Sequence, residues 1–173
     1  MAHIAILGLG NWGTAVARMW LLEGHKVKGW TIEQEVYESI TMDGINKKYL
    51  PDHSVEGLEA TMRIEEALDG VEIVVLAVPS SVILDVVDDI IPHLRPGHVL
   101  IDLAKGLAPG KRLISEAINE KLVAAKKSNT LSVVTGPTIA PEAAGGVITT
   151  ALVASEDESV AKRLAETLTT QTF

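Results

Sequence analysis

Short runs of consecutive apolar residues alternate with segments of helical periodicity along almost the whole chain, and this alternation narrows the choice of fold. Strands that are apolar at every position are buried on both faces, as in a parallel sheet covered by helices. Parallel neighbours need crossover connections, which are almost always right-handed. The pattern therefore predicts an α/β fold with a doubly wound, mainly parallel sheet.

The boundaries of these segments follow from the residue pattern. The segments expected to form strands are Ile4–Leu7, Lys26–Trp30, Ile73–Val78, Val99–Leu103, Leu131–Val134 and Ile148–Val153. The segments expected to form helices are Thr14–Leu22, Glu33–Ile40, Ile64–Leu68, Ser80–Ile91, Leu113–Ala124, Thr138–Ala144 and Ser159–Leu168. Ser80 or Ser81 is the expected N-cap of the fourth helix. The polar, irregular stretch Met42–Gly57 contains a proline and is expected to form a loop.

Length and charge limit the number of domains and the class of partner. The chain of 173 residues has the size of one domain. Its formal net charge of −8 argues against non-specific binding of nucleic acid, which depends on attraction to phosphates. No apolar run approaches the ~20 residues of a membrane-spanning helix, and the N-terminus has the pattern of a strand rather than of a signal peptide. We therefore expect a cytoplasmic protein without a nucleic-acid or membrane partner.

The types of residue available exclude several chemistries. The chain has no cysteine, which excludes a disulfide scaffold, a thiolate zinc site and a cysteine nucleophile. None of its five histidines pairs with another at the spacing of metal ligands. No metal site is expected.

A glycine motif, Gly8-Leu9-Gly10-Asn11-Trp12-Gly13, directly follows the first expected strand and opens the first expected helix. In this context Gly8 permits a tight turn, Gly10 lets the backbone approach a pyrophosphate, and Gly13 lets helix and strand pack closely. The amides of Asn11, Trp12 and Gly13 and the helix dipole would face the phosphates. The motif indicates a dinucleotide site.

The residues after the second strand bear on the choice between NAD and NADP. At this point of such a site an acid accepts the ribose 2′-hydroxyl, whereas an arginine favours a 2′-phosphate. The sequence Lys28-Gly29-Trp30-Thr31-Ile32-Glu33 contains no arginine. Glu33 follows Gly8 somewhat later than the usual spacing of about 20 residues, and a solvated helix residue is the other interpretation of it. The segment favours NAD, with NADP as the alternative.

Ligands of open α/β sheets bind outside the carboxyl ends of the strands, so residues that directly follow the expected strands are candidates. Pro79 follows the third strand. Lys105 follows the fourth and could neutralise a bound anion or polarise a carbonyl. Gly136-Pro137-Thr138 follows the fifth and could offer a backbone N–H and a hydroxyl. The other interpretations are an ordinary surface lysine and a plain turn with a helix cap.

Five segments stand out as motifs: Gly8-Leu9-Gly10-Asn11-Trp12-Gly13-Thr14-Ala15, Asn46-Lys47-Lys48-Tyr49-Leu50-Pro51, Ala77-Val78-Pro79-Ser80, Lys105-Gly106 and Gly136-Pro137-Thr138-Ile139-Ala140-Pro141-Glu142. In this order, over the whole chain, they resemble the soluble NAD(P)-dependent glycerol-3-phosphate dehydrogenases. The Asn-x-x-Tyr-Leu-Pro and Gly-Pro-Thr-x-Ala-x-Glu segments are far more specific than the glycine motif alone.

The resemblance implies a Rossmann-type domain and an oxidoreductase that acts on the CH–OH group of a small phosphorylated substrate. Members of the family transfer a hydride between NAD(H) or NADP(H) and dihydroxyacetone phosphate or glycerol 3-phosphate. Ala140 would lie near the nicotinamide, and Lys105 would touch both cofactor and substrate. Motif and resemblance together assign Gly8, Gly10, Asn11, Trp12, Gly13, Glu33, Pro79, Lys105 and Ala140 to the cofactor, and Lys105, Gly136 and Thr138 to the substrate.

The family also has a C-terminal helical domain, which carries the acid–base lysine and most of the substrate phosphate site. By this resemblance the acid–base lysine would lie beyond Phe173, the last residue of the sequence. Residues 1–173 are therefore expected to be the dinucleotide-binding domain, with no catalytic residue of its own and little turnover alone. A homodimer is compatible with the sequence.

The segment after the second strand departs from the family pattern. Many bacterial members carry an arginine or a polar residue just after the tryptophan of this strand, where this chain has Thr31 and Ile32. This departure leaves the choice of cofactor open.

Two other interpretations remain. The first is another dehydrogenase of this architecture that acts on a β-hydroxyacid, a nucleotide sugar or ketopantoate, which would share the glycine motif but not the segments around Asn46 and Gly136. The second is a non-catalytic module that senses NAD(H).

Overall fold

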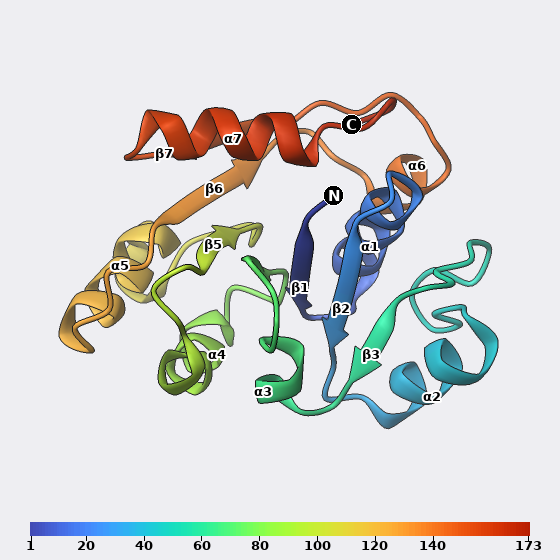
Figure 1. The fold of residues 1–173 in the computed structure, drawn as a ribbon, viewed down its shortest axis with the longest axis horizontal. Coiled ribbons are helices and arrows are strands. Elements are labelled where there is room, and N and C mark those ends of the chain that lie inside the picture. Colours follow the sequence, from blue (N-terminus) through green and yellow to red (C-terminus); the bar gives the residue numbers. More distant parts are fainter.

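The computed structural model describes all 173 residues, and one seven-stranded sheet runs through its centre (Figure 1). The strands are β1 (His3–Leu7), β2 (Lys26–Trp30), β3 (Glu59–Thr61), β4 (Ile73–Leu76), β5 (Val99–Asp102), β6 (Leu131–Thr135) and β7 (Leu152–Ser155). Their order across the sheet is β3-β2-β1-β4-β5-β6-β7. Every neighbouring pair is parallel except β6 and β7, which are antiparallel. The predicted fold class is confirmed.

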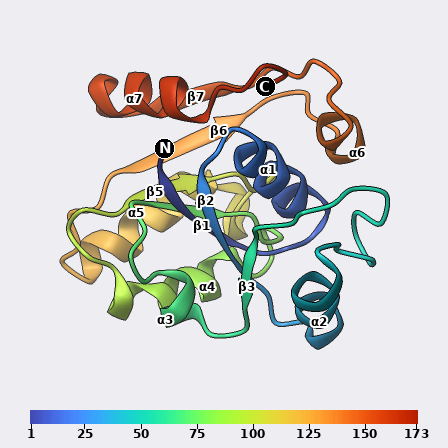
Figure 2. The same ribbon diagram turned by 45° about the vertical axis from the view of Figure 1, so that its right-hand side comes forward.

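Helices cover both faces of the sheet (Figure 2). They are α1 (Asn11–Leu22), α2 (Gln34–Asp43), α3 (Ile64–Ala67), α4 (Ile83–Ile90), α5 (Ile114–Ala124), α6 (Ala140–Ala144) and α7 (Glu158–Leu168), with two short 3-10 turns, η1 (Ile91–His93) and η2 (Pro109–Lys111). Buried residues of α1, α2, α6 and α7 form the core on one face. Buried residues of α3, α4 and α5 form the core on the other. No helix is both long enough and apolar enough to span a bilayer.

The central strand β1 shows why its sequence is apolar at consecutive positions. Ile4 and Ile6 enter the core beneath α1, whereas Ala5 and Leu7 enter the opposite core, and all four are fully buried. Such a strand needs apolar residues on both faces. Parallel pairing aligns Ile4 with Ile73 of β4, so the two central strands present their carboxyl ends at the same edge.

The chain reverses its direction of travel across the sheet at β1. The strands β2 and β3 lie to one side of β1, and β4, β5 and β6 lie to the other. In a sheet of this kind, the crevice between the two halves at the carboxyl ends of the strands is the usual place for a ligand.

The structure corrects two expectations about elements and adds one strand that was not expected. The strand predicted over Ile148–Val153 is formed by Leu152–Ser155, and it runs antiparallel; Ile148 is 80% exposed rather than part of the core. The edge strand β3 was not predicted, because its three residues carry no apolar pattern. The N-cap of α4 is Val82 rather than Ser80 or Ser81, and no side chain caps that helix.

Candidate functional site

A cleft of about 670 Å³ opens where the sheet changes direction, at the carboxyl ends of β1, β2, β4 and β5. Four post-strand segments supply most of its lining: residues 8–12, 30–33, 77–80 and 103–105. Tyr49 reaches it from the long connection between α2 and β3. The cleft therefore has the location at which open α/β sheets bind ligands.

The turn from β1 into α1 needs two of its glycines for packing. Gly8 has φ +107°, and a Cβ there would lie 2.9 Å from the carbonyl oxygen of Ala77. A Cβ on Gly13 would lie 1.9 Å from the carbonyl oxygen of Gly8, so only glycine lets the helix begin so close to the strand. Gly10 is different, because a Cβ there would meet no protein atom within 4 Å. The space in front of Gly10 thus remains available to a ligand.

The N-terminus of α1 is suited to an anion. Gly10 is the N-cap and has no side chain with which to cap the helix. The amide of Thr14 makes the first helical bond, 3.0 Å to the carbonyl oxygen of Gly10. The amides of Asn11, Trp12 and Gly13 precede it, and the first turn has no acidic residue. Free amides and the helix dipole together form a binding site for a phosphate group.

A buried asparagine braces this turn from outside. The side-chain amide of Asn46 donates to the carbonyl oxygen of Leu9 and to the hydroxyl oxygen of Thr14, each at 2.8 Å. Asn46 is fully buried although it lies in a polar stretch. It belongs to one of the five motifs, but its role was not predicted. A lone asparagine five residues before a proline gave no local signal of burial.

Glu33 lies at the mouth of the cleft, as the N-cap residue of α2. One carboxylate oxygen accepts from the hydroxyl of Tyr49 at 2.8 Å, and the other accepts from the ammonium of Lys48 at 2.5 Å. These hydrogen bonds, that of Lys48 first, hold the pKa of Glu33 below its ordinary value. The carboxylate is therefore ionised and held in place rather than free in solvent.

On the other side of the cleft, Lys105 follows β5 and its ammonium donates to the carbonyl oxygen of Thr138 at 3.0 Å. The turn before it is shaped by Asp102, whose carboxylate accepts from the amide of Ala104 at 2.8 Å. Asp102 is 3% exposed, and burial raises the pKa of its carboxyl to about 6. Asp102 was not predicted as a site residue because it was counted as part of an apolar strand. The signal that could have identified Asp102 as a candidate site residue was an acid between two apolar residues, Ile101 and Leu103.

Gly136 and Thr138 lie together with Lys105 and Trp12 around a cavity of only about 10 Å³. A Cβ on Gly136 would lie 2.5 Å from the carbonyl oxygen of Thr150, so packing against the segment before β7 already requires a glycine. Thr138 is 8% exposed, and its amide donates to the carbonyl oxygen of Gly136. The structure thus brings the expected substrate residues together but leaves Thr138 little access to a ligand.

Phe173 lies against the beginning of α1, next to the glycine turn. Its ring meets that of Trp12 edge to face, with the ring centroids 6.1 Å apart. Aromatic pairs in this geometry contribute about 0.5–1.5 kcal/mol beyond the burial of their surface. A phenyl ring has no proton to exchange, so Phe173 packs against the site and takes no part in acid–base chemistry. The position of the acid–base lysine beyond Phe173 stays a prediction.

Ala140 is the first residue of α6 and packs with Trp12 in a small apolar cluster against α1. Pro79 lines the cleft beside the glycine turn. No group of three or more histidine, aspartate or glutamate side chains is placed to hold a metal ion. The residues fit a dinucleotide instead: an open glycine turn for a pyrophosphate and a carboxylate for a ribose. Fold and cleft together define a Rossmann-type dinucleotide-binding domain.

Comparison with known proteins identifies the family. A family model described as the N-terminus of NAD-dependent glycerol-3-phosphate dehydrogenase matches residues 3–161. The chain belongs to this family, and the resemblance inferred from the five motifs is confirmed. It is 38% identical over 175 aligned residues to a glycerol-3-phosphate dehydrogenase [NAD(P)+] of an Exiguobacterium species, covering 100% of this chain and 51% of that protein. It is 34% identical over 172 residues to the Halothermothrix orenii enzyme of the same name, covering 99% of this chain and 49% of that protein.

A solved structure agrees with this. The crystal structure of glycerol-3-phosphate dehydrogenase from Coxiella burnetii superposes with a TM-score of 0.91 at 32% identity. The match covers 99% of this chain and 52% of that one. The chain therefore spans about half the length of the relatives it matches.

Proposed function

We propose that this chain is the cofactor-binding part of an NAD(P)-dependent glycerol-3-phosphate dehydrogenase. The whole protein would transfer a hydride between the nicotinamide and dihydroxyacetone phosphate or sn-glycerol 3-phosphate. The observation that carries the proposal is the uncapped N-terminus of α1 behind the open turn at Gly10, at the reversal point of the sheet. Family membership supports the choice of chemistry.

Bound in the cleft, a nicotinamide dinucleotide would supply the hydride acceptor or donor. Gly8 and Gly13 hold the turn that carries the amides, and Gly10 leaves room for the pyrophosphate. The amides of Asn11 and Trp12 would donate to its oxygens. The remaining cofactor residues would be Glu33 at the adenosine ribose, Pro79 along the cleft, and Lys105 and Ala140 towards the nicotinamide.

Lys105 is the strongest candidate for a group that meets both ligands. Its ammonium is fixed by the carbonyl oxygen of Thr138 at the end of the cleft, in a chain of net charge −8. A positive charge at this point would offset the phosphate of the substrate and polarise the substrate carbonyl. Gly136 and Thr138 would help to shape the substrate end. We assign no acid–base residue to this chain, since the relatives are about twice as long and the resemblance puts that lysine in their other half.

A fluorescence titration with NADH tests the cofactor site directly. Trp12 and Trp30 both line the cleft, so bound NADH should quench tryptophan emission and receive energy from it. We expect saturable binding. A signal that rises linearly with NADH concentration, with no saturation, would contradict the proposal.

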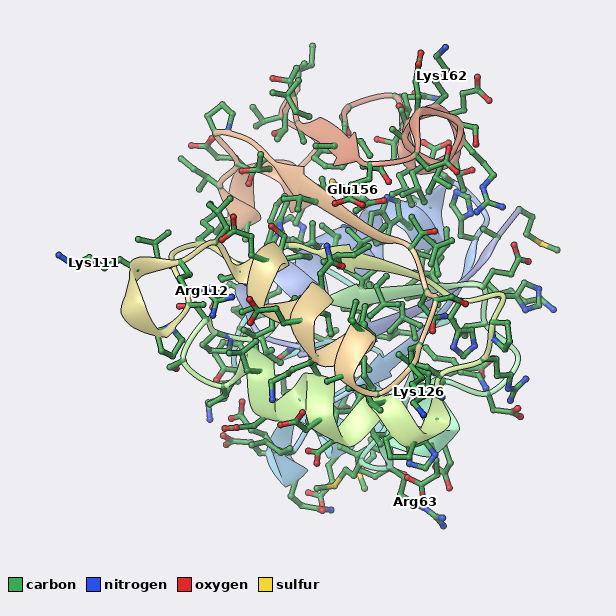
Figure 3. All side chains as sticks on the ribbon, turned by 90° about the vertical axis from the view of Figure 1, so that its left-hand side faces the viewer. Arg63, Lys111, Arg112, Lys126, Glu156 and Lys162 are labelled. Atoms are coloured by element: carbon green, nitrogen blue, oxygen red, sulfur yellow. The ribbon has the colours of Figure 1, made fainter.

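A second experiment tests the role of Lys105 in the whole protein. We expect Lys105→Met to lower kcat/KM for dihydroxyacetone phosphate by at least about 100-fold, as for loss of a group that stabilises developing charge. Lys162→Met is the matched control, because Lys162 lies on α7 and points away from the body of the molecule (Figure 3). Equal activity of the two variants would remove Lys105 from the site. The cytoplasmic location and the homodimer stay predictions.

A further inference from the structure

The segment of residues 46–51 has no role in the function proposed above, yet two of its side chains bind the acid at the mouth of the cleft. We propose that Lys48 and Tyr49 hold the carboxylate of Glu33 in place to accept the ribose 2′-hydroxyl of NAD, and that this arrangement selects NAD against NADP. The inference rests on the proposed function, because it concerns the same cleft.

The position of Glu33 is fixed at several points. Its amide donates to the hydroxyl oxygen of Thr31 at 3.1 Å, which orients the backbone just after β2. One oxygen of its carboxylate accepts from the hydroxyl of Tyr49 and the other from the ammonium of Lys48. A carboxylate oxygen can accept more than one hydrogen bond, so these partners leave acceptor capacity for a sugar hydroxyl.

The same turn of chain also fixes the phosphate side of the cleft. Residues 46–50 form one turn, in which the amide of Leu50 donates to the carbonyl oxygen of Asn46 at 2.8 Å. The side-chain oxygen of Asn46 accepts from the amide of Tyr49 at 3.2 Å, while its amide group holds Leu9. Leu50 is buried against Ala15 of α1. One turn therefore sets the distance between the glycine turn and Glu33, which a dinucleotide must bridge.

The charges at this edge disfavour a 2′-phosphate. Lys48 lies between Glu33 and Glu35 and forms ion pairs with both, so its charge is already balanced by two carboxylates. The neighbouring Lys47 is paired with Asp43 at 2.7 Å. A 2′-phosphate carries about −1.5 to −2 charges at neutral pH, and it would meet the carboxylate of Glu33.

The other cations that flank this edge of the sheet, Lys28 and Arg63, already have partners. Ile32, which stands between Thr31 and Glu33, is apolar and 75% exposed. Arg63 follows β3 but is paired with Glu65 and points outward (Figure 3). The ammonium of Lys28 donates to the carbonyl oxygens of Glu66 and Asp69. A phosphate on the ribose would therefore have to break an existing ion pair or hydrogen bond to recruit one of these cations.

The test compares dissociation constants of the chain for NADH and NADPH by the fluorescence titration. We expect NADH to bind at least about tenfold more tightly than NADPH, a ratio that corresponds to about 1.4 kcal/mol. Glu33→Gln should weaken NADH several-fold and strengthen NADPH, so that the ratio falls towards one. Wild-type binding of NADPH as tight as that of NADH would overturn the inference, and so would a ratio unchanged in Glu33→Gln.

The positioning role of Tyr49 is tested by a ratio of two affinities, because a general loss of stability would lower both affinities and leave their ratio unchanged. The 2′-deoxyribose analogue of NADH lacks the hydroxyl that Glu33 would bind. The wild-type chain should bind NADH several-fold more tightly than this analogue. Tyr49→Phe should reduce this ratio of affinities. The control variant Tyr37→Phe, on α2, should leave the ratio unchanged. Lys48→Ala should reduce it too, with Lys47→Ala as the adjacent control.

Each outcome of this comparison has one meaning. Equal weakening of NADH and the analogue in Tyr49→Phe would mean that Tyr49 supports only the fold, and the inference would fail while the cofactor site stood. Binding of neither NADH nor NADPH to the wild-type chain would overturn the proposed function itself, and the inference with it.

Discussion

The side-chain amide of Asn46 lies 2.8 Å from the carbonyl oxygen of Leu9, although 37 positions of sequence separate the two residues. The contact brings the long connection between α2 and β3 back onto the glycine turn. The turn is therefore supported from two sides, by the strand beneath it and by a buried polar side chain outside it.

Asn46→Ala should destabilise the protein and loosen the cofactor site. The carbonyl oxygen of Leu9 would keep only the hydroxyl of Thr14, and the buried hydroxyl would lose a donor. Loss of a buried hydrogen-bond partner costs about 1–3 kcal/mol, which a urea unfolding curve would detect. Asn119→Ala on α5 is the control and should unfold like wild type. Equal midpoints for the two variants would show that Asn46 does not brace the turn.

Gly10→Ala and Gly13→Ala should separate ligand binding from folding. A Cβ at Gly10 meets only open space, and the φ of −74° at this residue suits alanine. In Gly10→Ala the free energy of unfolding should therefore change by less than about 0.5 kcal/mol, while the affinity for NADH falls at least tenfold. A Cβ at Gly13 overlaps the carbonyl oxygen of Gly8 and should destabilise the fold by about 3 kcal/mol. Unchanged NADH affinity in Gly10→Ala would place the pyrophosphate elsewhere.

Asp102→Asn should stabilise the protein in a pH-dependent way. Burial raises the pKa of Asp102 from 3.8 to about 6, so the folded state binds a proton more readily than the unfolded state. The ionised carboxylate is therefore destabilising above pH 6, by at most about 3 kcal/mol, and this penalty disappears as the pH falls towards 3.8.

The asparagine keeps an oxygen for the amide of Ala104 but carries no charge. Its advantage over wild type in the free energy of unfolding should be largest at pH 8 and vanish near pH 4. Urea unfolding at both pH values measures it. An advantage that stayed constant with pH would show that the carboxyl is not titrating in this range.

Arg18→Met should free α6 from α1. The guanidinium of Arg18 donates to the carbonyl oxygen of Ala144 at 3.2 Å and to that of Ser54 at 2.5 Å. Without it, amides of α6 and of the segment around Ser54 should exchange with solvent faster, whereas those of α4 should not change. Arg163→Met on the exposed face of α7 is the comparison. Equal exchange in both variants would show that apolar packing alone holds α6.

The sequence predicted the central sheet well because strands buried on both faces have few permitted residues. The apolar run Ile73–Val78 was predicted to be a buried strand, and the structure has β4 over Ile73–Leu76. Edge elements carry no such restriction. In β3 one residue is exposed and two are half-buried, and β7 alternates exposed with half-buried positions. The local pattern therefore gave no sign of β3, and neither the direction nor the start of β7.

The residues of the site also fall into those that the sequence predicted and those that it did not. The glycine turn could be predicted because the motif directly follows the first expected strand and opens the first expected helix, which is where a dinucleotide site needs it. Glu33 could be predicted as a candidate, but its partners could not, since Lys48 and Tyr49 reach it through a loop without periodicity. Asp102 escaped notice because its burial depends on neighbours in β4 and β6, which only the register of the sheet brings to it.

The central place of β1 has a consequence for the order in which the protein can be assembled during synthesis. Ile4 leaves the ribosome long before Ile73, its partner in β4, and the three helices and two strands between them do not pair with that edge of β1. Until β4 is made, the nascent chain carries an apolar strand with one unpaired edge. The glycine turn that follows β1 is thus among the first parts of the cleft to be synthesised. It can pack against Ala77 only after the ribosome has made β4 and the residues that follow it.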